Sequence, residues 1–142
     1  MKKILNILSK GSWFPVLLAR LSVGWVFIES GWGKLHNLPK VIEFFQSLGI
    51  PAPEFQARMV AFTELGGGFC LCVGLFSRLA SIPLTATMVV AILTAKRADI
   101  NSMSDLFAME EYLFILVFLW VIFSGPGKAS LDALLARRLR KS

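Results

Sequence analysis

Four long apolar stretches, separated by short polar connections, dominate the hydrophobic pattern of the chain. They cover about residues 13–35, 55–76, 78–95 and 108–124. An α-helix needs roughly 20 residues, at about 1.5 Å of rise per residue, to cross a bilayer. The pattern therefore predicts an all-α fold, with residues 1–142 forming one integral membrane domain built as a four-helix bundle.

Turn-forming residues indicate where these helices begin and end. Pro15 lies in the first turn of the first stretch, where a missing N–H group costs little. Only a tight turn fits between the second and third stretches, so these two helices should be antiparallel neighbours. The run from Gly125 to Gly127 ends the fourth stretch.

Three shorter segments carry apolar residues mainly on one face. Residues 39–48 start with Pro39 and are followed by Gly49, and residues 130–140 start with Ser130, a residue type that caps helices. Residues 1–10 mix lysines with isoleucine and leucine. We expect all three to lie along the membrane surface, because they are too short or too basic to span it.

Composition supports a membrane protein and argues against a soluble domain. Hydrophobic residues make up 56% and charged residues 17%, against about 45–50% and about 25% in soluble domains. The net charge of +6 gathers near both ends of the chain, which favours contact with anionic lipid over nucleic acid. Arg20 and Glu29 interrupt the first stretch, so we expect it to remain as a helix and not to be cleaved as a signal peptide.

The distribution of lysine and arginine predicts the orientation in the membrane. Four spans place both termini on one side, together with the turn between the second and third helices. That side holds nine basic residues: Lys2, Lys3, Lys10, Arg78, Lys128, Arg137, Arg138, Arg140 and Lys141. The other side holds four: Lys40, Arg58, Lys96 and Arg97. Because basic loops stay in the cytoplasm, both termini should be cytoplasmic in an inner (cytoplasmic) membrane.

Three charged residues lie inside predicted spans, namely Arg20, Glu29 and Glu64. Each costs roughly 2.5–3.5 kcal/mol on insertion scales, so each needs a partner or a function. Lys34 lies at the outer rim, where its long side chain can reach the headgroups.

Glu29 and Glu64 lie at similar depths, roughly 10 Å below the outer surface by helix rise. If they face each other, repulsion and desolvation would favour retention of a proton between them. Such a pair suits a proton-handling or quinone-headgroup site. The alternative is a structural carboxylate that Lys34 or Arg58 neutralises.

Arg20 cannot pair with Glu29, because nine residues place the two side chains about 180° apart on one helix. Another helix, or the carbonyl groups at the end of one, must supply its partner. Arg78, at the start of the third helix, is either a headgroup contact or part of a pocket rim. His36 and Tyr112 lie on the outer side, where they are interfacial residues or hydrogen-bonding walls of the same pocket.

The glycines predict close contact between helices. Gly66, Cys70 and Gly74 form a run of small residues at every fourth position, and Gly24 and Gly31 should allow similar close packing on the first helix. Gly67 and Gly68 follow Glu64 closely, and Gly68 would make room beside it. Cys70 and Cys72 should point to nearly opposite sides of their helix, which suits neither a disulfide nor a metal site.

No motif for a bound cofactor or metal is present: His36 is the lone histidine, and Gly31 to Lys34 lacks the spacing of a phosphate loop. Any electron-transfer role would therefore need a partner protein. Enzymatic activity is left open at this point.

Three stretches, in this order and spacing, resemble the DoxX family of small membrane proteins. They run from Arg20 to Leu35, from Glu64 to Ala80 and from Glu111 to Asp132, and the resemblance covers roughly residues 14–136. It implies a four-helix membrane fold and a link to quinone-coupled sulfur oxidation, because the name-giving member is similar to a subunit of a thiosulfate:quinone oxidoreductase. Arg20, Lys34, Glu64 and Arg78 match the family pattern, whereas Glu29 stands where many relatives have an apolar residue or histidine.

Three functions fit these observations. The first is a redox-linked, quinone-associated membrane subunit that acts with a protein partner. The second is a non-catalytic scaffold or assembly factor in which the same polar residues hold the bundle together. The third is a small-molecule or proton carrier, which with four helices would need a homo-oligomer.

Overall fold

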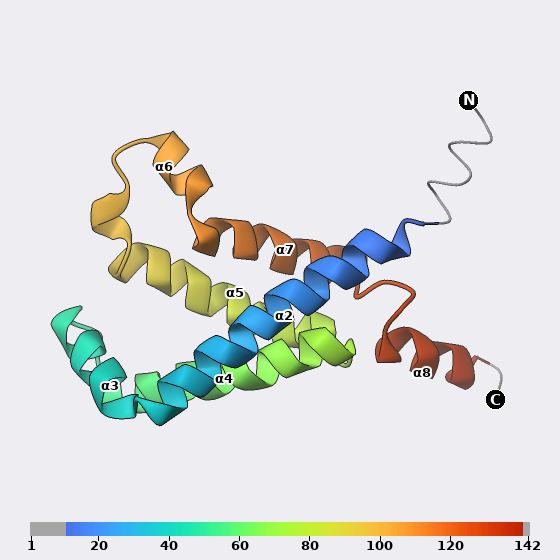
Figure 1. Cartoon of the computed structure of the whole chain (residues 1–142), viewed down its shortest axis with the longest axis horizontal. Coiled ribbons are helices and arrows are strands. Elements are labelled where there is room, and N and C mark those ends of the chain that lie inside the picture. Colours follow the sequence, from blue (N-terminus) through green and yellow to red (C-terminus); the bar gives the residue numbers. More distant parts are fainter. Residues whose placement is uncertain (1–10, 141–142) are drawn as a thin grey trace.

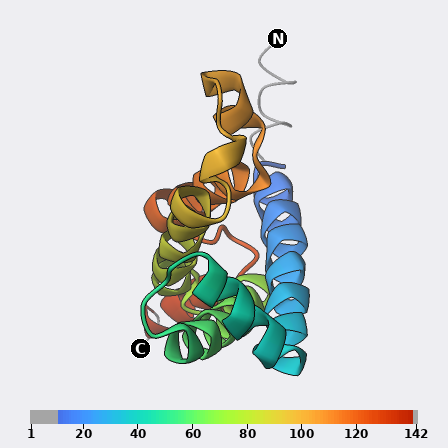
Figure 2. The same cartoon turned by 90° about the vertical axis from the view of Figure 1, so that its left-hand side faces the viewer.

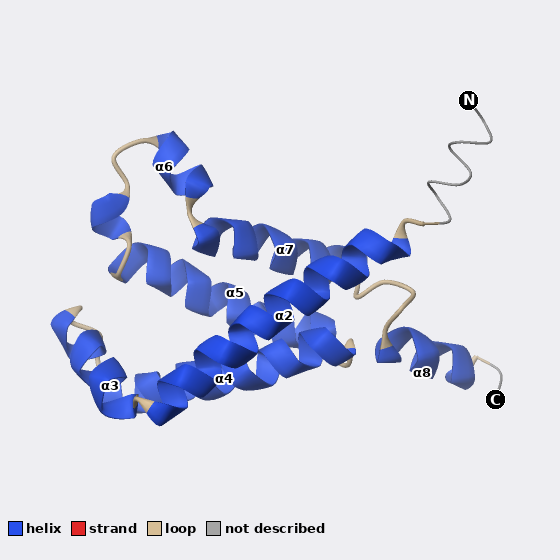
Figure 3. Ribbon diagram, in the orientation of Figure 1, coloured by secondary structure: helices blue, strands red, loops and turns tan. Residues whose placement is uncertain are grey.

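The computed structural model describes residues 11–140, and the predicted surface segment at residues 1–10 lies outside this part of the chain. Within it the fold consists of helices and loops, with no strand (Figure 3). The long helices are α2 (Trp13–His36), α4 (Pro53–Val73), α5 (Ser77–Thr94) and α7 (Glu110–Ser124). Shorter helices connect or follow them: α3 (Leu38–Ser47), the 3-10 turn η1 (Arg97–Asp99), α6 (Met103–Ala108) and α8 (Leu131–Leu139).

The connection between α4 and α5 differs from the predicted one. Helix α4 ends at Val73 and not near residue 76, because the next residues leave the right-handed helical region. Gly74 has φ of 75° and Phe76 has φ of 50°, both left-handed, a conformation that glycine adopts freely. The chain therefore reverses within three residues, and α4 and α5 become neighbours.

Helix α6 lies in a region where the sequence predicts only a polar connection. Its N-terminus is held by a capping box: the Asp105 backbone N–H donates to Ser102 Oγ at 3.3 Å, and the Ser102 N–H donates to Asp105 Oδ2 at 2.8 Å. The spacing of a serine and an acidic residue three positions later is a known signal for a helix start. The sequence contains this signal, but the helix is only six residues long.

The long helices form two pairs, α2 with α4 and α5 with α7, and the contact of α4 with α5 joins them (Figures 1 and 2). At one end lie α3 and α6; at the other lie the α4–α5 turn and α8 (Figure 1). We call the first the α3 end and the second the α8 end. Both ends of the described chain, at residues 11 and 140, lie at the α8 end.

Glycine allows the backbones of α2 and α4 to touch. A Cβ atom on Gly31 would lie 2.7 Å from the Ala61 carbonyl oxygen, and one on Gly24 would lie 2.8 Å from that of Gly68. The predicted packing of Gly24 and Gly31 is therefore present. Small residues at such a contact allow the close approach that is typical of membrane helices.

On α4, however, the predicted stripe of Gly66, Cys70 and Gly74 is wrong. Gly66 is exposed, with no atom within 4 Å of a built Cβ, and Gly74 serves to end the helix. The buried small residues are Ala57, Ala61, Gly67 and Gly68. Gly68 faces α2, while Gly67 packs against the Leu84 side chain of α5 at 2.8 Å, so neighbouring glycines serve two different contacts.

The buried core lies where the two pairs meet. Phe27 of α2 is 3% exposed, and its ring centroid lies 5.2 Å from those of Phe114 and Phe118 on α7. Both contacts are edge-on, the arrangement that aromatic rings prefer. Leu71, Leu84, Met88 and Val121 complete this cluster with Val23. The aromatic contacts connect α2 to α7 across the space between the pairs.

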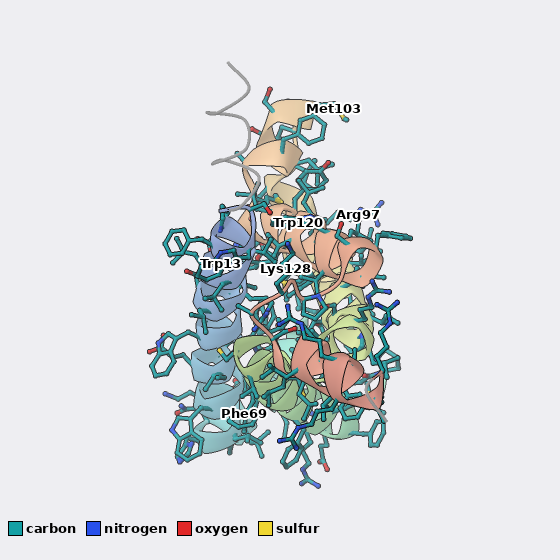
Figure 4. The ribbon with its side chains drawn as sticks, turned by 90° about the vertical axis from the view of Figure 1, so that its right-hand side faces the viewer. Trp13, Phe69, Arg97, Met103, Trp120 and Lys128 are labelled. Atoms are coloured by element: carbon teal, nitrogen blue, oxygen red, sulfur yellow. The ribbon has the colours of Figure 1, made fainter. Side chains whose placement is uncertain are left out.

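The exterior of the helices is apolar. Large hydrophobic side chains such as Trp13, which is 41% exposed, and Phe69, which is 63% exposed, lie on the surface (Figure 4). A soluble protein seldom exposes apolar surface so widely. Two helices, α2 and α5, are long and apolar enough to span a membrane by length and composition, whereas α7 has only 15 residues.

Candidate functional site

A cavity of about 690 Å³ lies between the two helix pairs. Residues of α2, α3, α4, α5 and α7 line it, and the loop from Leu48 to Pro51 contributes at the α3 end. Most of the wall is apolar and includes Phe27, Phe45, Met59, Val60, Met88 and Phe114. Cavities that bind small molecules have roughly this size, an apolar wall and a few polar groups.

A charged cluster forms one wall of this cavity. Glu64 of α4 is 2% exposed and forms an ion pair with Lys34 of α2. Ser30, one helical turn before Lys34, donates from its Oγ to Glu64 Oε2 at 2.8 Å, and Lys34 Nζ donates to Ser30 Oγ at 2.6 Å. All three residues line the cavity. The spacing of four residues puts Ser30 and Lys34 on the same face of α2.

The cluster keeps hydrogen-bonding capacity for a ligand. Both bonds to Glu64 involve Oε2, and within residues 11–140 no group donates to Oε1. Lys34 uses two of its three N–H donors, on Ser30 and on Glu64. Its side chain is 26% exposed. The wall therefore presents one acceptor and one donor side by side.

Further polar groups lie towards the α3 end. Glu110 and Glu111, in the first turn of α7, line the cavity. Lys96, just after α5, lies 3.9 Å from Glu111 in a partly exposed ion pair. Exposed pairs of this kind add little stability, so the main effect of this one is to place charge beside the cavity.

Glu29 does not belong to the site, so the first of the two alternatives, a Glu29–Glu64 carboxylate pair, is not formed. Glu29 is exposed and does not line the cavity. Each residue turns an α-helix by about 100°, so the neighbouring Ser30 faces Glu64 and Glu29 faces away. Of the two cations considered for Glu64, Lys34 makes the pair, and Arg58 is exposed.

His36 and Tyr112 also lie outside the wall of the cavity. His36 is exposed; its Nδ1 lies 3.0 Å from the Trp32 carbonyl oxygen, and its ring centroid lies 4.3 Å from that of Trp32. Tyr112 is half-buried, with its ring centroid 5.2 Å from that of Phe107. The structure thus gives both residues local contacts, in accord with the interfacial alternative.

Arg20 lies at the opposite end of the molecule, and carbonyl groups bind it. It is 1% exposed. Its Nε donates to the Leu71 carbonyl at 2.8 Å and its Nη2 to that of Cys72 at 3.3 Å, both in the last turn of α4. Its Nη1 donates to the carbonyls of Pro126 and Ala129. The carbonyl end of a helix carries partial negative charge, which suits a guanidinium.

Asp132 completes this arrangement, which we call the Arg20 clasp (Arg20, Gly74, Ser130 and Asp132). The Asp132 carboxylate accepts from the backbone N–H of Phe76 at 2.9 Å and of Ser77 at 3.3 Å, at the start of α5. Its own N–H donates to the Gly74 carbonyl at 3.0 Å. Ser130 caps α8 by accepting from the Ala133 N–H at 3.1 Å. The clasp therefore ties the segment after α7 to the α4–α5 turn.

Arg78 is exposed at this same end and lies far from the cavity. Its Nη2 is close to Gly125, where a Cβ would come within 2.9 Å. It therefore does not form a rim for the cavity at the α3 end. Among the described residues no group of three metal-ligating side chains occurs, and Cys70 and Cys72 are free thiols.

Sequence reasoning missed two residues that matter, Ser30 and Asp132. Ser30 bridges Lys34 and Glu64, and Asp132 holds the start of α5. The sequence signal that could have identified Ser30 is its position one helical turn before Lys34, on the same face of α2. For Asp132 no local signal exists, because its partners lie 55 and 56 residues away in the sequence.

The fold and the apolar exterior define a small helical membrane protein with an internal cavity. The DoxX family model matches residues 15–97, more than half of the chain. The protein therefore belongs to the DoxX family of membrane proteins.

Named relatives cover most of the chain. The inner membrane protein YqjF of Escherichia coli is 25% identical over 87% of this chain and 93% of its own length. Putative oxidoreductase CatD of Bacillus subtilis is 30% identical over 82% of this chain and 83% of its own length. The membrane protein Rv3486 of Mycobacterium tuberculosis is 31% identical over 87% of this chain and 82% of its own length. No solved structure matches the chain.

Proposed function

We propose that the protein is a redox-linked membrane subunit that binds a quinone or quinol in the cavity between its helix pairs. A partner protein carries the electrons. The observation that carries the proposal is the Lys34–Glu64–Ser30 cluster in the wall of an otherwise apolar cavity. The name of the relative CatD contains the word oxidoreductase, which is in accord with this class of function.

The proposal includes a topology in which α2, α4, α5 and α7 all cross the membrane. The α8 end, which carries Arg78, Lys128, Arg137, Arg138 and Arg140, faces the cytoplasm. Helix α7 spans only about 22 Å at 1.5 Å per residue, and the bilayer or the flanking α6 segment accommodates the difference. The α3 end then faces outward.

The hydrogen-bonding groups of the cluster can bind both redox forms, the quinone and the quinol. A quinone presents carbonyl acceptors, to which the third N–H of Lys34 can donate. A quinol presents hydroxyl donors, which Glu64 Oε1 can accept. Reduction of a quinone to a quinol takes two electrons and two protons, and titratable groups beside the ring can hold and pass those protons.

The apolar wall suits the rest of such a molecule. Four large hydrophobic residues of the wall are also exposed on the outside of the helices: Val26, Phe44, Met59 and Val90. The cavity therefore connects with the apolar exterior, so a lipid-soluble molecule can enter from the bilayer. A water-soluble substrate would gain little from such a path.

Binding of a ubiquinone analogue with a decyl tail to the purified protein in lipid nanodiscs tests the proposal. We expect saturable binding that Glu64→Gln weakens at least tenfold, because the amide can no longer pair with Lys34 or accept as strongly. Glu29→Gln is the matched control: it removes an exposed carboxylate of the same helix pair and should leave the affinity unchanged. Equal affinity of the wild type and both variants for the analogue would rule out this site.

A scaffold or assembly factor remains the second candidate, and α8 favours it. Beyond the Arg20 clasp, α8 exposes Leu131, Leu134 and Leu135, a surface that another protein can contact. Absence of quinone binding, together with recovery of a stable complex that depends on α8, would support this function. A redox subunit instead predicts that a flavin- or haem-containing protein is recovered with the chain in mild detergent.

A further inference from the structure

A second cavity lies at the α8 end, between α8 and the α4–α5 turn (Figure 1). It has a volume of about 700 Å³ and shares no residue with the cavity between the helix pairs. Leu75 forms its wall on the side of the turn. Helix α8 contributes three leucines and three arginines: Leu131, Leu134, Leu135, Arg137, Arg138 and Arg140. We call this cavity the α8 groove.

The Arg20 clasp holds the two sides of the groove together. The Asp132 N–H donates to the Gly74 carbonyl at 3.0 Å, and the Asp132 carboxylate accepts from the Phe76 N–H at 2.9 Å. A Cβ atom on Gly74 would lie 2.7 Å from that of Ser130, so the turn and the start of α8 are in close contact. Leu75 lies between Gly74 and Phe76. The groove is therefore preformed, and a ligand does not have to order its walls.

The apolar side of the groove ends in a charged group. Leu131, Leu134 and Leu135 lie on one face of α8, and Arg138 takes the next position on that face, seven residues after Leu131. The three leucines are 40%, 54% and 50% exposed, so the described chain leaves a large part of each uncovered. A ligand that lies along this face meets apolar side chains and then a guanidinium.

The charges that line the groove are all positive. Arg137, Arg138 and Arg140 are exposed, and within residues 11–140 no carboxylate pairs with any of them. Asp132, the acidic residue of α8, binds the start of α5 instead. A guanidinium can bind a phosphate through two parallel N–H···O bonds. The chemistry of the groove therefore suits a phosphate that carries an apolar group.

We propose that the α8 groove binds one anionic phospholipid of the cytoplasmic leaflet, with its phosphate on the arginines and an acyl chain on the leucines. The proposal rests on the transmembrane topology proposed above, which places the α8 end at the cytoplasmic surface. Anionic lipids give that surface a negative potential, which attracts basic segments. The proposal is independent of what the cavity between the helix pairs binds.

The groove is continuous with the apolar exterior of the bundle. Phe76 directly follows Leu75 and is 62% exposed, and Leu79, in the first turn of α5, is 65% exposed. An acyl chain can therefore pass from the groove over these side chains to the bilayer while the phosphate stays on α8. A free phosphate ion would use only the arginines and would leave the leucine face uncovered.

A lipid fits this surface better than a protein partner does. The centre of a protein–protein interface contains few charged residues, whereas Arg138 stands within the leucine face of α8. A protein would also have to bring an acidic group to each arginine. One phospholipid supplies both the apolar chain and the anionic group, and the membrane always provides it.

Native mass spectrometry of the whole protein in mild detergent tests the site. The two probes are phosphatidylglycerol and phosphatidylcholine with identical acyl chains. We expect one phosphatidylglycerol to bind at least about tenfold more tightly than phosphatidylcholine, because each arginine attracts an anionic headgroup. Equal affinities for the two lipids would contradict the proposal.

Two variants with the same loss of charge separate a defined site from general attraction. The groove variant carries Arg137→Gln, Arg138→Gln and Arg140→Gln. The control variant carries Lys40→Gln, Arg58→Gln and Arg97→Gln, three exposed cations that do not line the groove. The groove variant should bind phosphatidylglycerol at least about tenfold more weakly, and the control should differ from the wild type by less than about threefold. Equal weakening in both variants would overturn the proposal.

Leu134→Ser and Leu139→Ser test the apolar part of the groove. Both leucines are exposed on α8, but only Leu134 lines the groove. Leu134→Ser should weaken phosphatidylglycerol binding at least about threefold, because it removes apolar contact with the chain, and Leu139→Ser should leave the affinity unchanged. Displacement of the lipid by millimolar inorganic phosphate would identify a phosphate-ion site instead. That result, or a protein found on the groove in place of lipid, would contradict the proposal.

This proposal and the quinone proposal fail separately. Because no residue lines both cavities, the groove variant should bind the decyl-tailed quinone analogue with unchanged affinity. Glu64→Gln should retain the tight binding of phosphatidylglycerol. Lipid binding in detergent does not depend on the orientation of the chain in a membrane, so this measurement is also independent of the proposed topology.

Discussion

Two buried charged residues have very different surroundings: Arg20 contacts the last turn of α4, whereas Glu64 lies in the middle of that helix. Arg20 is 1% exposed and donates to four backbone carbonyls. Glu64 is 2% exposed, and both of its hydrogen bonds come from side chains, Lys34 and Ser30. Arg20 is enclosed by the chain itself, whereas Glu64 borders a cavity.

The difference indicates which of the two can act on a ligand. The carbonyls that bind Arg20 belong to a helix end and a loop, so they cannot move without disturbing the fold. Side chains such as Lys34 and Ser30 can rotate and exchange partners. The Arg20 clasp is therefore structural and the Lys34–Glu64 cluster is adaptable. The following predictions test this division, beginning with the largest expected effect.

Replacement of Arg20 should have the largest effect on stability. Arg20→Leu removes a guanidinium with four hydrogen bonds and leaves the carbonyls of Leu71, Pro126 and Ala129 without this donor. Each bond to a charged group contributes about 1.5–3 kcal/mol, so we expect a loss of at least about 3 kcal/mol. Thermal unfolding of the protein in detergent measures this loss.

Arg20→Lys tests whether the positive charge alone is enough to hold the clasp. It keeps the charge but cannot reach four carbonyls, because an ammonium lacks the planar fork of the guanidinium. We expect it to be nearly as destabilising as Arg20→Leu. A lysine variant as stable as the wild type would show that charge, and not the geometry of the clasp, holds the α8 end.

The contact between α2 and α4 supplies the next largest effect. In Gly31→Ala the new Cβ would lie 2.7 Å from the Ala61 carbonyl oxygen, so the two helices must separate. Overpacking of this kind costs about 1–3 kcal/mol. Gly33→Ala, two residues along the same helix, meets nothing within 4 Å.

The control variant should therefore be neutral or up to about 1 kcal/mol more stable, because alanine favours a helix over glycine. Chemical or thermal unfolding of both proteins in one detergent makes the comparison. Because Lys34 and Glu64 lie on these two helices, Gly31→Ala should also weaken quinone binding. Equal stability of the two variants would mean that α2 and α4 are not in backbone contact.

A second pair of variants separates folding from function at the cluster. Lys34→Met should cost about 1–3 kcal/mol, because the Glu64 carboxylate, which is 2% exposed, loses its cation and keeps only the hydrogen bond from Ser30. Lys34→Met with Glu64→Leu should recover most of that loss, since an apolar pair often replaces a buried ion pair without cost. Neither protein should bind the quinone analogue well.

Binding and unfolding, measured on the same samples, decide whether the cluster binds a ligand or only holds the helices together. A double variant that is stable and does not bind supports an adaptable, functional cluster. If it instead binds as well as the wild type, the Lys34–Glu64 pair serves only to hold the helices together. Glu29→Gln again provides the control for loss of a carboxylate outside the cavity.

Much of the fold could be predicted from sequence because it follows from local patterns. Hydrophobic length predicts α2 and α5, and Ser130 signals the start of α8, where it does accept the capping bond. Gly74, whose left-handed φ of 75° ends α4, was interpreted from the sequence as a packing residue, so the end of α4 was predicted too late. Helix α6 was missed because its capping box precedes only six helical residues.

The candidate site could be predicted only in part, because depth along a helix is easier to infer than direction around it. Glu29 and Glu64 lie at similar depths, but α2 turns Ser30 and not Glu29 towards α4. The rotation of α2 follows from Gly24 and Gly31, which face α4 in close contact. The angular positions of Gly24 and Gly31 around α2, relative to Glu29, follow from the sequence. The face of α4 that contacts them does not, because Gly66, which was expected on that face, is exposed.

The smallest expected effect concerns the α3 end, where a local capping box, and not a clasp, holds the connection between α5 and α7. Asp105 accepts hydrogen bonds from the Ser102 and Asn101 backbone N–H groups, at 2.8 Å and 3.1 Å. Hydrogen bonding, first with the Ser102 side chain and then with these N–H groups, lowers the pKa of Asp105 below its ordinary value of 3.8. A lowered pKa means that the cap contributes stability above about pH 4 and loses it as the pH falls through the folded value.

We therefore expect acid to open α6 while the Arg20 clasp stays closed, because the four hydrogen bonds from Arg20 go to backbone carbonyls and involve no carboxylate. Hydrogen exchange should show faster exchange at the amides of Met103 to Ala108 below about pH 4, beyond the intrinsic change of rate, with no change at Ala129 to Ala133. Asp105→Asn should show this faster exchange at neutral pH and lose the pH dependence. Equal loosening of both segments in acid would mean that the two ends of the molecule are not held independently.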